Sequence, residues 1–183
     1  MGSRDAVELK NGRLALNPQK CWVDVWAFER AFNGNGTILK EENSSLAKRT
    51  MELYRGTFLP SSTQAWAASM RDRVQSKFVR FVDRYGSYIE KQGKMALAID
   101  CYLSALDSCP LAENIYQKLM LCYAKEGQTA EAMNVCLRCR KTLMAEYGID
   151  LSRKTDELCQ RIKNSVEPDL QEPFHSYSSP PAG

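Results

Sequence analysis

The sequence has little of the chemistry on which most enzymes depend. Its 183 residues include one histidine, His175, which stands in a stretch rich in proline and serine near the end of the chain. No glycine-rich phosphate loop of the Walker type occurs, and no spacing of acidic residues pairs two carboxylates for acid–base work. We therefore predict that the chain is not an enzyme and has no catalytic residue and no cofactor.

Long hydrophobic runs are also absent. No stretch approaches the roughly 20 consecutive apolar residues that a membrane-spanning helix needs, and no apolar signal segment stands near the start. Charge of one sign is not in large excess, because the net charge is only +3. These absences predict a cytoplasmic protein without membrane contact, and the composition gives no reason to expect nucleic acid as a direct partner.

Seven cysteines are scattered along the chain, an odd number in a sequence without a signal segment. This pattern predicts free and mostly buried thiols in a reducing compartment. Cys136 and Cys139 have the spacing of half a zinc site, but the second pair of ligands is missing. Free cysteine packs as a small hydrophobic side chain. We therefore interpret both residues as core positions and predict no metal site.

What the sequence does contain is helical periodicity, with one exception at its start. Asn11-Gly12 lies between two short stretches with apolar residues, which predicts a β-hairpin over residues 7–16. Apolar residues then recur at steps of three or four, the period of a helix. A long helix is expected to begin at Ser62 or Thr63 and to end at Gly93. The other predicted helices span residues 24–32, 45–55, 95–108, 112–126 and 129–147, and a last one follows Ser152.

An internal repeat with a period of 34 residues runs through the middle of the chain. Gly93 corresponds to Gly127, and Ala98 corresponds to Ala132. The glycines are expected to end the first helix of each pair in a left-handed conformation, and the alanines to mark the closest approach of two helices. This period is typical of tetratricopeptide repeats. We predict an all-α, tetratricopeptide-like right-handed superhelix of about seven helices, with a short N-terminal β-hairpin and with helices 24–32 and 45–55 as a divergent first pair.

Two polar surfaces are candidates for binding. Repeat proteins bind along their concave face, which in this pattern comes from the first helix of each pair. Its predicted residues are Arg80, Asp83, Ser87, Glu90, Lys91, Asn114, Gln117, Leu121 and Lys125. A basic stripe on the long helix is either a site for phosphate groups and acidic proteins or a solvated helix face. It consists of residues spaced by three or four, namely Arg73, Lys77, Arg80 and Arg84.

Two stretches in the first half of the chain, Trp22–Glu29 and Leu53–Pro60, carry a resemblance to a known family. Together with later residues in the same order, they resemble the bacterial transcriptional activator domain of the antibiotic regulatory protein type of transcription regulators. The later residues are Trp66, Arg71, Pro110, Glu113, Tyr116, Leu119, Met120, Gly127, Glu131, Ala132, Leu143, Tyr147, Gly148, Ser152, Thr155, Leu158 and Ile162. The resemblance covers about residues 20–163.

The resemblance implies a domain organisation and a function. Residues 1–20 are a tag plus the hairpin remnant of an upstream winged-helix domain, residues 21–166 are the activator domain, and residues 167–183 are a disordered tail. The implied function is a regulatory protein-interaction module that contacts itself, other domains of a longer regulator, or the transcription machinery, RNA polymerase included. DNA is then read only by the missing winged-helix part. The alternative is a sensor domain that binds a small anionic ligand, such as a nucleotide, in the helical groove or on the basic stripe.

Overall fold

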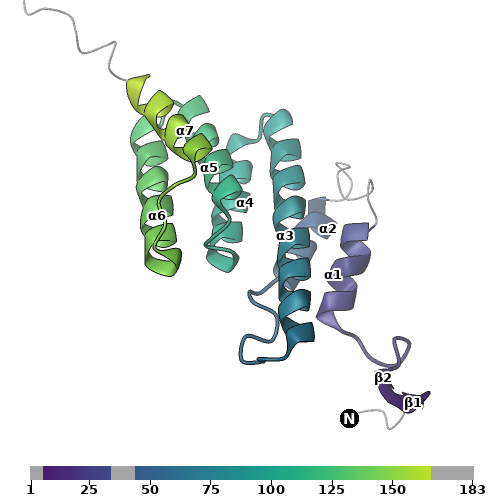
Figure 1. The fold of residues 1–183 in the computed structure, drawn as a ribbon. Coiled ribbons are helices and arrows are strands. Elements are labelled where there is room, and N and C mark those ends of the chain that lie inside the picture. Colours follow the sequence, from purple (N-terminus) through teal and green to yellow (C-terminus); the bar gives the residue numbers. More distant parts are fainter. Residues whose placement is uncertain (1–5, 34–43, 166–183) are drawn as a thin grey trace, which may run out of the picture.

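The computed structural model describes residues 6–33 and 44–165, and this part of the chain forms a two-stranded hairpin followed by seven helices (Figure 1). The all-α fold with a short N-terminal hairpin is therefore confirmed. The predicted tail, residues 167–183, lies outside the described residues. The elements are β1 (Val7–Lys10), β2 (Arg13–Leu16), α1 (Asp24–Asn33), α2 (Ser44–Leu53), α3 (Ala65–Lys91), α4 (Met95–Ser108), α5 (Glu113–Lys125), α6 (Thr129–Tyr147) and α7 (Arg153–Asn164).

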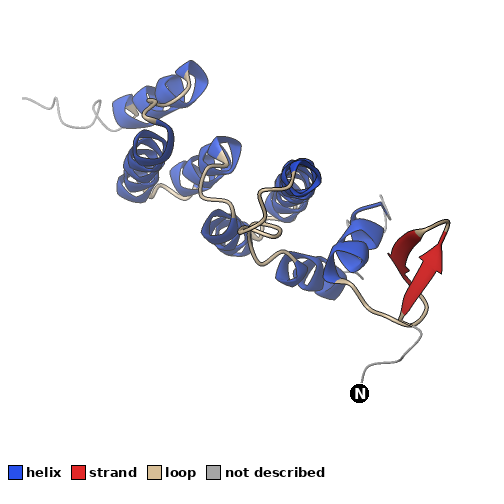
Figure 2. Cartoon of the chain, turned by 60° about the horizontal axis from the view of Figure 1, so that its bottom comes forward, coloured by secondary structure: helices blue, strands red, loops and turns tan. Residues whose placement is uncertain are grey.

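The helices stack in two layers. Helix α1 contacts α3, α3 contacts α5, and α5 contacts α7, while α2, α4 and α6 pack beside them. Figure 2 shows the two resulting rows, with the hairpin beyond one end. Helices α1 and α2 pack against each other, as predicted for the divergent first pair. The hairpin and α7 lie at opposite ends of the stack (Figure 1).

The 34-residue repeat corresponds to two helix pairs, α3–α4 and α5–α6. Gly93 and Gly127 have φ angles of 71° and 73°, the left-handed conformation that this type of helix end requires. Ala98 and Ala132 are fully buried, as expected where two helices approach closely. Helix α6 runs to Tyr147, as predicted, and ends at a left-handed glycine.

A close contact between α3 and α4 lies at a glycine that the repeat pattern did not single out. A Cβ atom on Gly86 would come within 2.4 Å of the Tyr102 ring. Tyr102 is fully buried, and its hydroxyl donates a hydrogen bond to Glu90 Oε1 at 2.7 Å. The ring therefore fills the space over the α3 backbone that glycine leaves open.

The predicted start of the long helix was wrong, because α3 begins at Ala65 rather than at Ser62 or Thr63. Arg71 Nη1 donates hydrogen bonds to the backbone carbonyls of Leu59 at 2.7 Å and of Ser62 at 3.1 Å. Leu59 has a φ angle of 43°, a left-handed conformation that side-chain-bearing residues seldom adopt. The Arg71 side chain thus holds a turn ahead of the helix, and the helix starts after it.

The prediction that every cysteine is free was wrong for two of the seven. Cys136 of α6 and Cys159 of α7 form a disulfide bond. Cys136 is a buried core position as predicted, but its partner is on the closing helix. The sequence pattern relates Cys136 only to Cys139, by their spacing. Cys139 lies one helical turn away and is a buried free thiol. The bond ties the last helix to the last full repeat.

Candidate interaction surfaces

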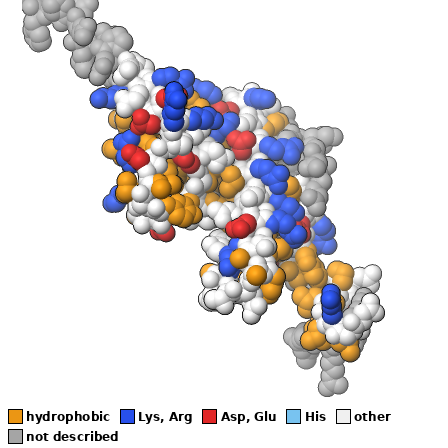
Figure 3. Space-filling view, viewed as in Figure 1, with side chains coloured by type: hydrophobic (Ala, Val, Ile, Leu, Met, Phe, Trp, Pro, Cys, Tyr) orange, Lys and Arg blue, Asp and Glu red, His pale blue; other side chains and the backbone are white. Residues whose placement is uncertain are grey.

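The hairpin presents an apolar face that the described part of the chain leaves exposed. Val7 lies opposite Leu16, and Leu9 lies opposite Leu14, so all four side chains point to one side of the sheet. Their exposed fractions range from 47% to 79%. Figure 3 shows hydrophobic side chains gathered over the hairpin. Contiguous exposed apolar residues of this kind mark contact surfaces.

A short hydrogen-bonded segment joins the hairpin to α1. The Asn17 amide donates to the Ala6 carbonyl at 2.8 Å, and the Asn17 side chain donates to the Glu8 carboxylate. The Cys21 thiol donates to the Asn17 carbonyl at 2.9 Å. Trp22 follows this segment and is largely exposed.

Residues of the two stretches that resemble the activator domain meet in an aromatic cluster between α1, α3 and the end of α2. The rings of Tyr54 and Phe78 stack with centroids 4.1 Å apart, and the Phe28 ring lies 6.3 Å and 6.4 Å from them. All three side chains are buried. Burial raises the pKa of Tyr54, whose hydroxyl accepts a hydrogen bond from the Cys109 thiol at 3.5 Å. These motif residues therefore hold the fold together.

The first two residues of the predicted basic stripe form ion pairs within the protein. Arg73 Nη2 and Lys77 Nζ contact Glu29 Oε1 of α1 at 3.0 Å and 2.8 Å. Glu29 stands 48 residues before Lys77 in the sequence, so no local pattern indicates this pairing. The ion pairs fasten α1 to α3 and neutralise part of the stripe.

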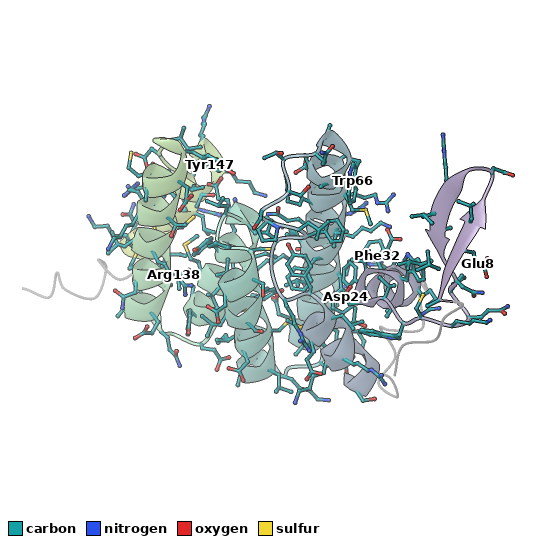
Figure 4. All side chains as sticks on the ribbon, turned by 90° about the horizontal axis from the view of Figure 1, so that it is seen from below. Glu8, Asp24, Phe32, Trp66, Arg138 and Tyr147 are labelled. Atoms are coloured by element: carbon teal, nitrogen blue, oxygen red, sulfur yellow. A yellow bond between two sulfur atoms is a disulfide. The ribbon has the colours of Figure 1, made fainter. Side chains whose placement is uncertain are left out.

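Lys77 and Arg80 of the stripe also face α1 through the ring of Phe32. Lys77 Nζ lies 5.8 Å and Arg80 Cζ lies 5.5 Å from the centre of the Phe32 ring, within the range of cation–π contacts. Figure 4 labels Phe32 on α1. Arg84 forms no ion pair with any residue that the structure describes. Basic side chains do gather along α3 (Figure 3), but much of this charge stabilises the first helix pair.

The predicted concave-face residues lie on α3 and α5, and two of them are ion-paired across that face. Lys125 Nζ donates to Glu90 Oε2 at 2.9 Å, and the Tyr102 hydroxyl donates to Glu90 Oε1. Burial alone would raise the pKa of Glu90, but the hydrogen bonds from Lys125 and Tyr102 outweigh burial and hold that pKa below its ordinary value. Glu90 is thus a charged structural link between three helices.

A residue that was not predicted, Lys118, occupies the centre of the same face. Its ammonium group donates to Ser87 Oγ at 2.9 Å and lies 3.7 Å from Asp83 Oδ1. Gln117 donates to Thr155 Oγ1 of α7 at 2.7 Å. These contacts join residues of α3, α5 and α7 that stand far apart in the sequence.

A groove of about 570 Å³ remains between α3 and the start of α5. Two predicted residues, Arg80 and Asn114, line it together with Asp72 and Glu113. The Glu113 carboxylate accepts a hydrogen bond from the Ser152 amide at 2.8 Å. The groove therefore contains more acidic than basic groups. The other two predicted residues, Lys91 and Leu121, are exposed.

Within residues 6–33 and 44–165, no three side chains of His, Cys, Asp or Glu come together in a way that suits a metal ion. His175 lies outside the described residues. None of the helices described is both long enough and apolar enough to span a membrane.

Comparison with known proteins places the helical stack in a family. Regulatory protein DnrI of Streptomyces peucetius is 24% identical over 171 residues, which cover 87% of this chain and 61% of DnrI. Regulatory protein AfsR of Streptomyces coelicolor is 28% identical over 117 residues, which cover 64% of this chain and 12% of AfsR. The chain thus spans less than two thirds of either relative. The bacterial transcriptional activator domain family matches residues 23–163, from α1 to α7, and the chain belongs to that family.

Proposed function

We propose that the chain is the protein-interaction module of a transcription activator and that its hairpin docks against another domain of the same regulator. The observation that carries this proposal is the exposed apolar face of Val7, Leu9, Leu14 and Leu16. A two-stranded hairpin is marginal in water by itself, so a partner that covers this face would stabilise it. Both relatives extend well beyond the matched region, which leaves room for such a partner domain.

The proposal includes a domain organisation. Residues 1–20 comprise a tag and the last hairpin of an upstream winged-helix domain, and residues 21–166 form the activator domain. The upstream domain contacts DNA in the cytoplasm, and the helical stack contacts protein partners, a second copy and RNA polymerase among them. Ion pairing of Arg73 and Lys77 with Glu29 supports protein rather than nucleic acid as the partner of the stack.

The test uses the regulator encoded by the complete reading frame that contains this chain. Substitution of Leu9→Ser together with Leu14→Ser should lower promoter activation at least about tenfold, the effect of about 1.4 kcal/mol of lost docking free energy. The melting temperature of the helical stack should stay unchanged, because the hairpin strands pack chiefly against each other.

A matched control removes two exposed apolar side chains at the other end of the molecule. Leu137 and Met144 of α6 are exposed to a similar degree as the hairpin residues, so Leu137→Ser with Met144→Ser should leave activation intact. Full activation by the hairpin variant, or an equal loss in the control, would refute hairpin docking.

The alternative function is a sensor for a small anionic ligand in the helical groove or on the basic stripe. Arg80 and Asn114 line the groove between α3 and α5, which favours a ligand there, but Asp72 and Glu113 line it as well. The carboxylates of Asp72 and Glu113 would repel an anion in this groove. Stabilisation of the chain by nucleotides in a thermal-shift measurement would support the sensor, since a ligand of the folded state raises the melting temperature. The charge distribution favours the interaction module.

A further inference from the structure

A cleft of about 700 Å³ lies between α2 and α4, over the second half of α3. Phe78, Tyr85 and Ile89 form its floor, and Met51 of α2 and Cys101 of α4 form its walls. The sulfur atoms of Cys101 and Met51 are 3.6 Å apart, so the walls meet at this point. Because α2 and α4 belong to the second layer of helices, the cleft lies away from the predicted concave face.

The interior of this cleft is apolar and uncharged. Burial raises the pKa of the Cys101 thiol to about 12, so the thiol stays neutral at physiological pH. Leu97 of α4 also lines the cleft and is 55% exposed. Neither the aromatic cluster nor the packing between repeats explains why the large apolar side chain of Leu97 is exposed here.

Charged groups at the rim of the cleft balance one another. Lys48 and Arg55 are basic, and Glu52 and Asp100 are acidic. None of these four side chains forms an ion pair with a residue that the structure describes, and the Arg55 side chain donates only to the backbone carbonyl of Glu52, at 3.4 Å. The rim therefore offers both hydrogen-bond donors and acceptors. Its two positive and two negative charges cancel, so it does not favour an ion of either sign.

We propose that this cleft binds a small, mainly apolar molecule that has no net charge and has polar groups at its edge. The volume lies within the range of roughly 300–1,000 Å³ that is usual for ligand sites, which combine an apolar lining with a few polar groups. The site differs from the anionic-ligand sites considered on the groove and the stripe in both place and charge. It is independent of hairpin docking, because it shares no residue with the hairpin.

The experiment titrates the chain with Nile red, a flat neutral dye whose fluorescence rises in apolar surroundings. We expect saturable binding at a single site. Leu97→Lys should weaken binding at least about tenfold, or about 1.4 kcal/mol, because it puts a charge beside the apolar wall. Leu137→Lys is the matched control, since Leu137 is 57% exposed on α6 and outside the cleft. Leu137→Lys should change the affinity for Nile red by no more than about twofold, because surface substitutions away from a site usually have small energetic effects.

Two further variants complete the experiment. Ser104→Trp places a bulky ring at the exposed edge of the cleft and should also abolish binding, with circular dichroism reporting that each variant is folded. Leu9→Ser with Leu14→Ser should leave dye binding unchanged. Dye binding that survives both cleft substitutions, or that disappears in the hairpin variant, overturns the cleft assignment. Tighter binding of the anionic dye 1-anilinonaphthalene-8-sulfonate than of Nile red overturns the inferred charge of the ligand.

Discussion

The first helix pair and the repeats that follow it are held together by different kinds of contact. Around α1, α2 and the first half of α3, large rings stack, as in Tyr54 on Phe78. Ion pairs cross between helices in both regions, as in Glu29 with Lys77 here and Glu90 with Lys125 in the repeats. From the second half of α3 to α7, small residues such as Gly86, Ala98 and Ala132 let helices approach closely. The repeats are thus distinguished by a recurring pattern of small residues, and the first pair by its stacked rings.

Helix α3 belongs to both regions and is the link between them. Its 27 residues pack on the first pair with one half and on α4 and α5 with the other. In a stack of repeats, stability comes from each unit and its direct neighbours. A substitution in one region should therefore loosen that region before the other.

The largest expected effect comes from Phe78→Ala. Phe78 is buried and stacks on Tyr54, and truncation of a buried phenylalanine costs about 3–5 kcal/mol of unfolding free energy. Hydrogen exchange should show α1 and α2 losing protection while α5–α7 keep theirs. Leu119→Ala, at a fully buried position of α5, should give the reverse pattern. Equal loss of protection along the whole chain in both variants would mean that the two regions unfold as one unit.

Reduction of the disulfide should act on the other end of the stack. Closing a loop between residues 23 positions apart stabilises a folded protein by about 2–4 kcal/mol, so dithiothreitol should lower the melting temperature and expose α7 first. Cys159→Ala should reproduce this effect. Cys139→Ala removes a buried free thiol from the same helix as Cys136 and should leave the response to dithiothreitol intact. A melting temperature that is insensitive to dithiothreitol would contradict a structural role for the bond.

The sequence predicts the features that depend on neighbouring residues and misses those that depend on distant ones. The helices and the left-handed glycines follow from local periodicity, and all were found within a few residues. Cys159, Glu29 and the target carbonyls of Arg71 lie far along the chain from their partners, and no local pattern connects them. The predicted concave-face residues lie on α3 and α5, and the pairing of Glu90 with Lys125 depends on the distance between these two helices, which periodicity does not give.

Gly86→Ala tests the close packing of the repeats. The added methyl group would overlap the buried Tyr102 ring, and overpacking of this kind costs about 1–3 kcal/mol. Alanine by itself favours a helix over glycine by about 1 kcal/mol, so the sign of the result identifies which effect dominates. In a Tyr102→Leu background the ring is gone, and Gly86→Ala should become neutral or stabilising in urea denaturation. A penalty of the same size in both backgrounds would show that Tyr102 is not the cause.

The smallest expected effect is the pH dependence that Glu90 contributes to the repeats. Its pKa lies below the ordinary value of 4.5, so its stabilisation is present above that value and is lost as the pH falls through the lowered pKa of the folded state. At neutral pH, Glu90→Gln should reduce the unfolding free energy by less than about 1 kcal/mol, because Lys125 is half exposed. Urea denaturation at a series of pH values should show this difference shrinking as the pH drops below 4.5. A difference that stays constant with pH would mean that Glu90 acts in the repeats through its shape and hydrogen bonds rather than through its charge.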